Sequence, residues 1–276
     1  MRWEKGRRSR NVVDARGRRG RKTATLSGGA IILALIAMFL FGQDPGSLLQ
    51  SGGGTPSTSA PVNDPAEAQV MDFLSVVLGD TEDVWGQLFA ASGSRYRQPK
   101  LVIFRDQVQS ACGFASAASG PFYCPGDSQL YMDLSFLSQL EKMGASGDFA
   151  LAYVVAHEVG HHIQNLTGRA RDVQDAKRRS SKTQANQLQI RMELEADCYA
   201  GVWAHHAQRQ RNILERGDVE EGLRAAASVG DDHLQRQARG YVVPESFTHG
   251  TSEQRMTWFR RGIETGNVSA CNTFGS

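Results

Sequence analysis

Apolar side chains recur at intervals of three and four residues along most of the chain after residue 64, and this spacing predicts helices. Between Phe149 and Ala156 the apolar run is continuous and free of proline, so we expect a buried helix that continues into the polar residues that follow. Gly79 is expected to end one helix, and Asp80 to begin the next. The expected helices cover residues 65–78, 80–91, 134–143, 149–162, 183–210, 219–238 and a last stretch around 256–263.

Short β-branched and aromatic runs between residues 99 and 133 predict a small sheet. Residues 99–104 suit a buried strand, 121–125 an edge strand flanked by prolines, 129–133 a further strand, and 112–120 a loop of small residues. An edge strand can pair with an extended peptide, although an ordinary hairpin explains the pattern equally well. The chain therefore predicts an α+β fold that is mainly helical.

The segment 26–42 contains no charged residue and includes a continuous apolar run from Ala30 to Phe41. As a helix it would be roughly 25 Å long, at the short end for a hydrocarbon core of about 30 Å. We expect an uncleaved transmembrane signal anchor, because the charged region before it is long and no small-x-small cleavage site follows. A cleaved signal peptide is the alternative.

Positive charge is concentrated before this segment. Residues 1–25 carry ten Lys and Arg against Glu4 and Asp14, a net charge of +8, which leaves −6 for the rest of a chain whose total is +2. A basic arm could bind nucleic acid, but here it directly precedes an apolar span, so we expect no nucleic-acid partner. The positive-inside rule instead predicts a single-pass membrane protein with a cytoplasmic arm at residues 1–25 and a periplasmic or extracellular folded domain.

Residues 43–64 are rich in Gly, Ser, Thr and Pro and have too few apolar side chains to build a core, so we expect a flexible linker. The folded domain is expected to begin with Asp64 and Pro65 as the cap and first turn of a helix, and to occupy residues 65–276.

Four cysteines agree with an exported domain, where disulfides form. Three pairings are possible, and we favour Cys112 with Cys124, which closes a short loop, leaving Cys198 with Cys271. Metal ligation by cysteine is the rival interpretation, but no C-x-x-C spacing supports it.

The strongest chemical signal is the H-E-x-x-H sequence that runs from His157 to His161. On a helix these two histidines are one turn apart and share a face, so both can bind a single ion. Glu158 lies beside them and could remove a proton from a metal-activated water. Neutral imidazoles and an adjacent carboxylate are typical of a catalytic Zn2+ site, so zinc is the expected cofactor.

Two histidines leave a catalytic zinc one protein ligand short, and the acidic sequence from Glu193 to Asp197 can supply it. On a helix Glu193 and Asp197 share a face, whereas Glu195 points elsewhere. We expect Glu193 to be the third ligand and Asp197 to accept the free N–H of a ligating histidine. Glu195 is expected to be a surface or salt-bridge residue.

The remaining histidines have simpler explanations. His162 is rotated about 100° from His161, so it should pack or hydrogen-bond nearby. His205 and His206 suit a helix end, where positive charge complements the dipole. His249 lies in a Gly/Ser/Thr loop, where it could donate a hydrogen bond to the reacting oxygen or have no role in the site.

Together these motifs resemble the YpfJ-like neutral zinc metallopeptidases over nearly the whole chain. The resemblance rests on the start Met1-Arg2-Trp3-Glu4, the loop from Cys112 through Tyr123-Cys124-Pro125, the sequence His157-Glu158-Val159-Gly160-His161-His162, the sequence Glu193-Leu194-Glu195-Ala196-Asp197-Cys198 and the ending Ser246-Phe247-Thr248-His249-Gly250-Thr251.

The pairing of H-E-x-x-H with E-x-x-x-D is also similar to that of the gluzincins, such as the HtpX-like and CAAX prenyl proteases. That resemblance implies a zincin-like fold, Glu193 as a ligand with Asp197 behind it, and a C-terminal histidine, here His249, that assists the transition state.

The sequence therefore predicts a membrane-anchored zinc-dependent endopeptidase that acts on peptides or proteins, with Glu158 as general base. A binding or scaffold protein of the cell envelope that retains a structural zinc is the alternative.

Overall fold

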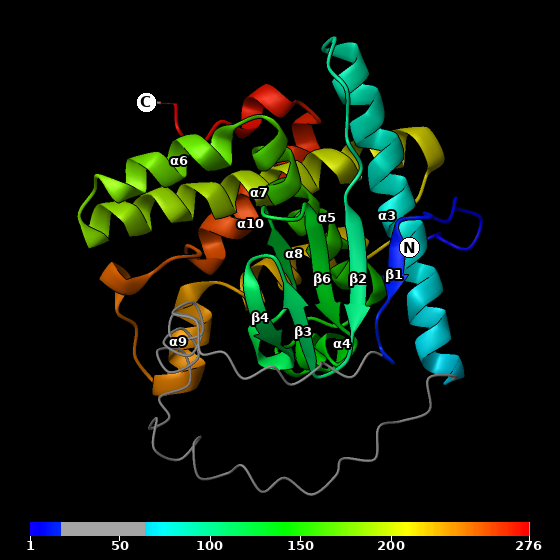
Figure 1. Cartoon of the computed structure of the whole chain (residues 1–276), viewed down its shortest axis with the longest axis horizontal. Coiled ribbons are helices and arrows are strands. Elements are labelled where there is room, and N and C mark those ends of the chain that lie inside the picture. Colours follow the sequence, from blue (N-terminus) through cyan, green and yellow to red (C-terminus); the bar gives the residue numbers. More distant parts are fainter. Residues whose placement is uncertain (18–63, 276) are drawn as a thin grey trace, which may run out of the picture.

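The structure is a computed structural model that describes residues 1–17 and 64–275, and helices make up most of these residues (Figure 1). This confirms the mainly helical α+β class. The helices are α3 (Pro65–Ala91), α4 (Phe136–Lys142), α5 (Asp148–Leu166), α6 (Arg169–Arg178), α7 (Lys182–Arg211), α8 (Asp218–Ser228), α9 (Asp231–Arg239) and α10 (Ser252–Thr265), with short 3-10 turns η1 (Ala117–Ser119), η2 (Pro244–Ser246) and η3 (Val268–Cys271).

A four-stranded sheet lies beside the helices in the order β1-β2-β6-β5. Its strands are β1 (Val12–Asp14), β2 (Lys100–Phe104), β6 (Gln129–Asp133) and β5 (Phe122–Cys124). The first three run parallel, and β5 is antiparallel to β6 at one edge. The three strands expected from the sequence are thus confirmed, whereas β1 and a separate hairpin, β3 (Gln107–Ser110) with β4 (Gly113–Ser116), were not expected.

Helix α5 is the centre of the core, because its apolar first half is buried on all sides. It packs against α7, α8 and α3. Phe149, near its start, stacks on Trp203 of α7 with ring centroids 6.0 Å apart. The continuous apolar run therefore holds rigidly the helix that carries the H-E-x-x-H sequence.

Helix α3 is continuous, so the expected helix end at Gly79 is wrong. Gly79 has ordinary helical geometry, and its lack of a side chain serves a close contact instead. A Cβ at this position would lie 2.5 Å from the carbonyl oxygen of Arg7. The glycine therefore lets the N-terminal segment cross the helix directly, a long-range reason that helix-ending rules do not include.

Residues 1–17 belong to this folded body, which corrects the expectation of an arm separate from the domain. Strand β1 pairs with β2, placing Val12 opposite Leu101. Arg7 binds Glu82 and Asp83 of α3, and the Ser9 hydroxyl donates to Glu82. Much of the basic charge of this segment is thus used in ion pairs with α3.

The expected span at 26–42 and most of the expected linker at 43–64 lie outside the described residues. Within residues 1–17 and 64–275, no helix has the length and apolar character needed to cross a membrane. A single crossing between residues 17 and 64 would separate β1 from β2, which pair directly. An arm and a domain on opposite sides of a membrane are therefore inconsistent with this strand pairing.

The expected helix at 219–238 is divided into α8 and α9. Gly230 lies at the break, and a Cβ there would meet the backbone nitrogen of Ser252 at 2.4 Å. The start of α10 thus packs directly against the backbone at the break. Asp231 begins the new helix beside the loop that contains His249.

Both expected disulfides are present. Cys112 joins Cys124 in the sheet region, and Cys198 of α7 joins Cys271 after α10. Since every cysteine is paired, metal ligation by cysteine is excluded.

Candidate metal centre

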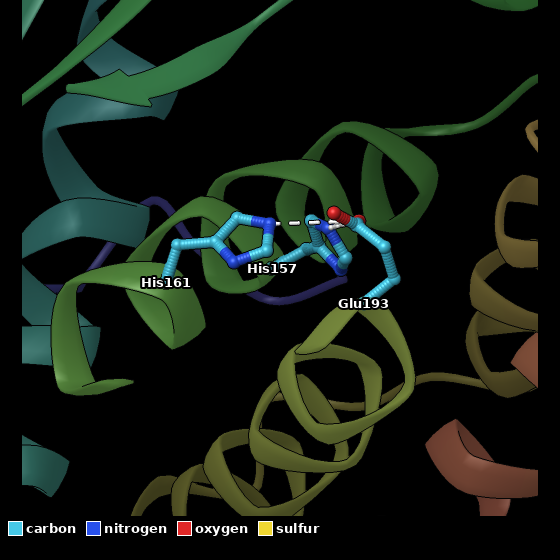
Figure 2. Close-up of side chains that lie close together, drawn as sticks. All are labelled: His157, His161 and Glu193. Carbon is cyan, nitrogen blue, oxygen red and sulfur yellow. Dashed lines mark hydrogen bonds and ion pairs between the residues drawn. The ribbon is translucent and has the colours of Figure 1, made fainter. Parts of the chain in front are cut away.

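His157 and His161 lie one turn apart on α5, and both face Glu193 on α7 (Figure 2). Oε2 of Glu193 lies 3.2 Å from Nε2 of His157 and 3.5 Å from Nε2 of His161. All three side chains are largely shielded from solvent. The structure therefore brings together the three residues expected from the sequence as metal ligands.

The close contact of α5 and α7 depends on small residues within the motifs. Gly160 lies between the two histidines, and a Cβ there would meet the Cα and the carbonyl oxygen of Ala196 at 2.9 Å. Ala196 belongs to the acidic sequence of α7. The absence of a side chain at Gly160 thus allows the carboxylate of one helix to reach the histidines of the other.

The two separations between Glu193 and the histidines fit a zinc ion. Tetrahedral ligands about 2.0–2.1 Å from Zn2+ are about 3.3 Å from one another, close to both observed separations. In the metal-free centre the charged groups stabilise one another. Burial opposes ionisation of Glu193, but His161 and His157 hold the pKa of Glu193 well below its ordinary value. Burial likewise opposes protonation of His161, but Glu193 raises its pKa to about 9. A metal that binds this carboxylate and these two nitrogens would displace the proton of His161.

Glu158 is buried next to this centre. Its Oε2 is one of the few buried side-chain atoms in the described residues that has no hydrogen-bond partner. Its carboxylate is close enough to His161 to contribute to the raised pKa of that histidine. An unpartnered buried carboxylate oxygen is costly, so its presence here favours a functional rather than a packing role.

His157 is held by charged and hydroxyl groups. Oδ1 of Asp197 lies 2.8 Å from Nδ1 of His157, so this nitrogen donates while Nε2 remains free to bind a metal. Asp197 also accepts hydrogen bonds from the Tyr153 hydroxyl and from the guanidinium of Arg255. The structure thus places Asp197 behind the histidine, as expected from its helical spacing.

His161 is held differently, by a neutral amide. Its Nδ1 donates to Oε1 of Gln164 at 2.9 Å, and the amide nitrogen of Gln164 donates to Glu195 at 3.0 Å. Glu195 also forms an ion pair with Arg169. The expectation of a salt bridge for Glu195 is therefore confirmed, but a surface position is wrong, because its side chain is only 1% exposed.

Glu193 is also held by a hydrogen bond outside the centre. Its Oε1 accepts a hydrogen bond of 2.8 Å from Gln189, one turn earlier on α7. The side-chain oxygen Oε1 of Gln189 in turn accepts a hydrogen bond from the ammonium of Lys177 on α6. These contacts leave Oε2 of Glu193 facing the histidines.

His249 lies in the loop before α10, and Asp231 fixes this loop. Oδ2 of Asp231 accepts hydrogen bonds from three successive backbone N–H groups, those of Thr248, His249 and Gly250. Oδ1 of Asp231 lies 3.2 Å from Nδ1 of His249. Burial lowers the pKa of His249, but Asp231 and the nearby Glu193 outweigh this and raise it. The loop therefore holds a potential hydrogen-bond donor near the metal centre.

His162, His205 and His206 form hydrogen bonds away from the metal centre, as expected for His162. His162 contacts the Tyr123 hydroxyl through Nδ1 and the carbonyl oxygen of Arg97 through Nε2. His205 and His206 contact the carbonyl oxygens of Ile263 and Gly266 at the end of α10. None of the three belongs to either group of potential metal ligands found among the described residues.

Sequence reasoning missed Arg255, Gln164 and Asp231. Gln164 follows His161 by three residues on the same helix, so helical spacing could have indicated it. Arg255 and Asp231 come from other helices, and no local pattern relates them to His157 or His249.

The chain matches the family described as "Putative neutral zinc metallopeptidase" over residues 1–274. It belongs to this family. The chain is 45% identical over 285 aligned positions to "Uncharacterized protein YpfJ" of Escherichia coli (strain K12), covering 100% of this chain and 99% of that protein. It is also 39% identical to "Uncharacterized protein Mb2605" of Mycobacterium bovis, covering 86% of this chain and 85% of that protein. No solved structure matches the chain.

Proposed function

We propose that this member of the family is a zinc-dependent endopeptidase. The observation that carries the proposal is the convergence of His157, His161 and Glu193 beside the unpartnered carboxylate of Glu158. Three donors of this kind with an open fourth position are the usual arrangement of a catalytic zinc site, and the family description agrees with it.

His157, His161 and Glu193 would hold the ion, which supplies Lewis-acid polarisation of the scissile carbonyl and of a water molecule. Glu158 removes a proton from the attacking water and passes it to the leaving amine nitrogen. The free Oε2 of Glu158 supports this role, because a carboxylate oxygen already engaged by another donor would be a poorer base. Peptide-bond hydrolysis needs no further group to carry the proton.

His249 would donate a hydrogen bond to the substrate oxygen on which negative charge develops. The raised pKa of His249 favours the donor form, and its loop is held by Asp231. Donors fixed in advance at such a position stabilise the transition state without rearrangement during the reaction.

The substrate strand would pair with β5. This strand is antiparallel to β6 at the edge of the described sheet. Its Tyr123 hydroxyl contacts His162, the residue next to His161, so β5 lies beside the helix that carries the histidines. An extended peptide added to this edge would run past the metal centre, which favours protein or peptide substrates.

The compartment we propose is oxidising and outside the cytoplasm, which the two disulfides support. Residues 1–17 would share it, because β1 pairs with β2. Lys5 and Lys100 are both exposed, so a membrane-impermeant amine reagent applied to cells with an intact cytoplasmic membrane should label both. Mass spectrometry that finds only one of them labelled would contradict this arrangement.

A scaffold protein with a structural zinc is the rival. Structural zinc sites use four protein ligands, whereas the histidine-containing cluster in residues 1–17 and 64–275 contains three. The three-ligand set therefore favours catalysis.

Purified full-length protein should cleave casein or members of a broad peptide library, and a chelator should abolish this activity. Glu158→Gln should retain zinc but lose cleavage, because the amide cannot accept the proton. Glu141→Gln, at an exposed position, is the matched control and should behave as wild type. Full cleavage by Glu158→Gln, or zinc without cleavage in the wild type, would contradict the proposal.

A further inference from the structure

Arg255 is an arginine buried beneath the candidate metal centre, with a side chain only 3% exposed. It lies on α10 and binds Asp197 of α7 through two parallel hydrogen bonds, from Nε to Oδ2 and from Nη2 to Oδ1, each of 2.8 Å. Such a two-point pairing fixes both the position and the plane of a carboxylate.

The same guanidinium reaches the helix that carries the histidines. Its Nη2 lies 3.2 Å from the Tyr153 hydroxyl and 3.3 Å from Nδ1 of His157, both on α5. Its Nη1 donates to the carbonyl oxygen of Val229. Arg255 therefore ties α10 to α5 and α7 at the point where His157 is held.

Stability alone does not account for this arrangement. Burying two charges is costly, and well-packed apolar residues of the same volume often stabilise a core as well as a buried ion pair does. The ion pair of Arg255 with Asp197 also fixes the orientation of the Asp197 carboxylate. Because two hydrogen bonds from Arg255 hold the Asp197 carboxylate, its Oδ1 faces His157 in one orientation. The imidazole of His157 is then fixed with Nε2 facing Glu193.

We propose that Arg255 is the positioning residue of the metal centre, acting through Asp197 to fix the ring of His157. This inference rests on the proposed zinc function. This role requires the planar guanidinium, which forms two hydrogen bonds to one carboxylate. Lysine offers a single point charge and therefore cannot fully replace arginine.

The test measures zinc affinity by chelator competition in Arg255→Met and Arg255→Lys, using the full chain. We expect Arg255→Met to weaken zinc binding on the order of 10- to 100-fold, as the loss of an outer contact to a ligand does. Arg255→Lys should fall between Arg255→Met and wild type. Co2+ bound in place of zinc should show an altered visible spectrum in both variants, because the ligand geometry changes.

A double variant separates positioning from packing. If Arg255 acts through Asp197, the variant Asp197→Asn/Arg255→Met should bind zinc about as weakly as Asp197→Asn alone. Losses of affinity that multiply instead would show that Arg255 acts by another route and would overturn the inference.

The control is Arg211, which forms ion pairs with Asp80 and Asp83 of α3 and not with a residue of the metal centre. Arg211→Met should lower the melting temperature of the zinc-free protein but leave zinc affinity unchanged. If Arg255→Met likewise lowers the melting temperature but leaves zinc affinity unchanged, Arg255 has only a structural role and the inference is overturned. Absence of zinc binding by the wild type would instead overturn the proposed function together with this inference.

Discussion

The two histidines of the candidate metal centre differ in what holds them. His157 is supported by a charged network, in which Asp197 is itself bound by Arg255 and Tyr153. His161, one turn later, is supported by the neutral amide of Gln164. Both supports fix the same tautomer, with the proton on Nδ1 and with Nε2 toward Glu193.

The groups that hold the two histidines differ in charge rather than in geometry. A carboxylate behind an imidazole increases its basicity as a ligand, whereas an amide mainly fixes its orientation. His161 is also the more exposed of the two, at 19% against 8%. We therefore expect His157 to be the anchoring ligand and His161 to be the one that adapts when substrate binds.

The largest loss of zinc affinity should come from a change at Glu193, which contacts both histidines. Glu193→Gln removes the negative charge that faces the two imidazoles, so zinc affinity should fall by more than about 100-fold, beyond the range of outer contacts. Chelator competition measures this. If Glu193→Gln retains zinc while Glu195→Gln releases it, the ligand assignment is wrong.

The next largest effect should come from the charged support. Asp197→Asn should weaken zinc binding on the order of 10- to 100-fold, because the amide cannot replace the charge behind His157. It also leaves Arg255 buried without its counter-ion, so the zinc-free protein should lose about 3–5 kcal/mol of stability. Urea unfolding in the presence of a chelator measures the second quantity. Unchanged zinc affinity would remove the distinction between the two supports.

A smaller effect is expected from the neutral support. Gln164→Leu keeps the volume but removes the acceptor for His161 and the donor to Glu195, so zinc affinity should fall by about tenfold or less. Thermal unfolding should show a loss of about 1–3 kcal/mol from the buried groups left unpaired. A loss of zinc affinity larger than that of Asp197→Asn would reverse the comparison.

The smallest change in zinc affinity is expected from a change at His162, which packs away from the metal centre. Burial lowers the pKa of His162 to about 4. Because the unfolded chain takes up the proton near pH 6.5, the folded state loses stability as pH falls from about 6.5 to 4, by up to about 3 kcal/mol. His162→Gln should flatten this loss in zinc-free protein unfolded with urea at several pH values. An equal pH dependence in both proteins would show that other groups cause it.

Local periodicity was sufficient for the part of the centre that lies on single helices. Spacing along α5 and α7 predicted His157, His161, Glu193 and Asp197, and the structure brings all four together. Arg255 could not be predicted, because its place depends on how closely α10 crosses α7. That crossing depends on Gly201, where a Cβ would lie 2.2 Å from the carbonyl oxygen of Phe259.

The same reasoning explains the errors at the N-terminus. Ten basic residues before an apolar segment indicated a separate arm, because composition does not reveal the acidic side chains that later pair with it. Arg7 and Arg8 meet Asp83 and Asp72 on α3, more than sixty positions along the chain. Gly79 was interpreted as a helix end for the same reason, since the segment that crosses it is distant in sequence.

The central claim is that one zinc ion lies between α5 and α7, and anomalous X-ray diffraction at the zinc absorption edge tests it most directly. Crystals of zinc-loaded full-length protein should show a strong peak within about 2.2 Å of Nε2 of His157, Nε2 of His161 and a carboxylate oxygen of Glu193, with no fourth protein ligand. A peak at another position, or a fourth side chain that closes the site, would contradict the account.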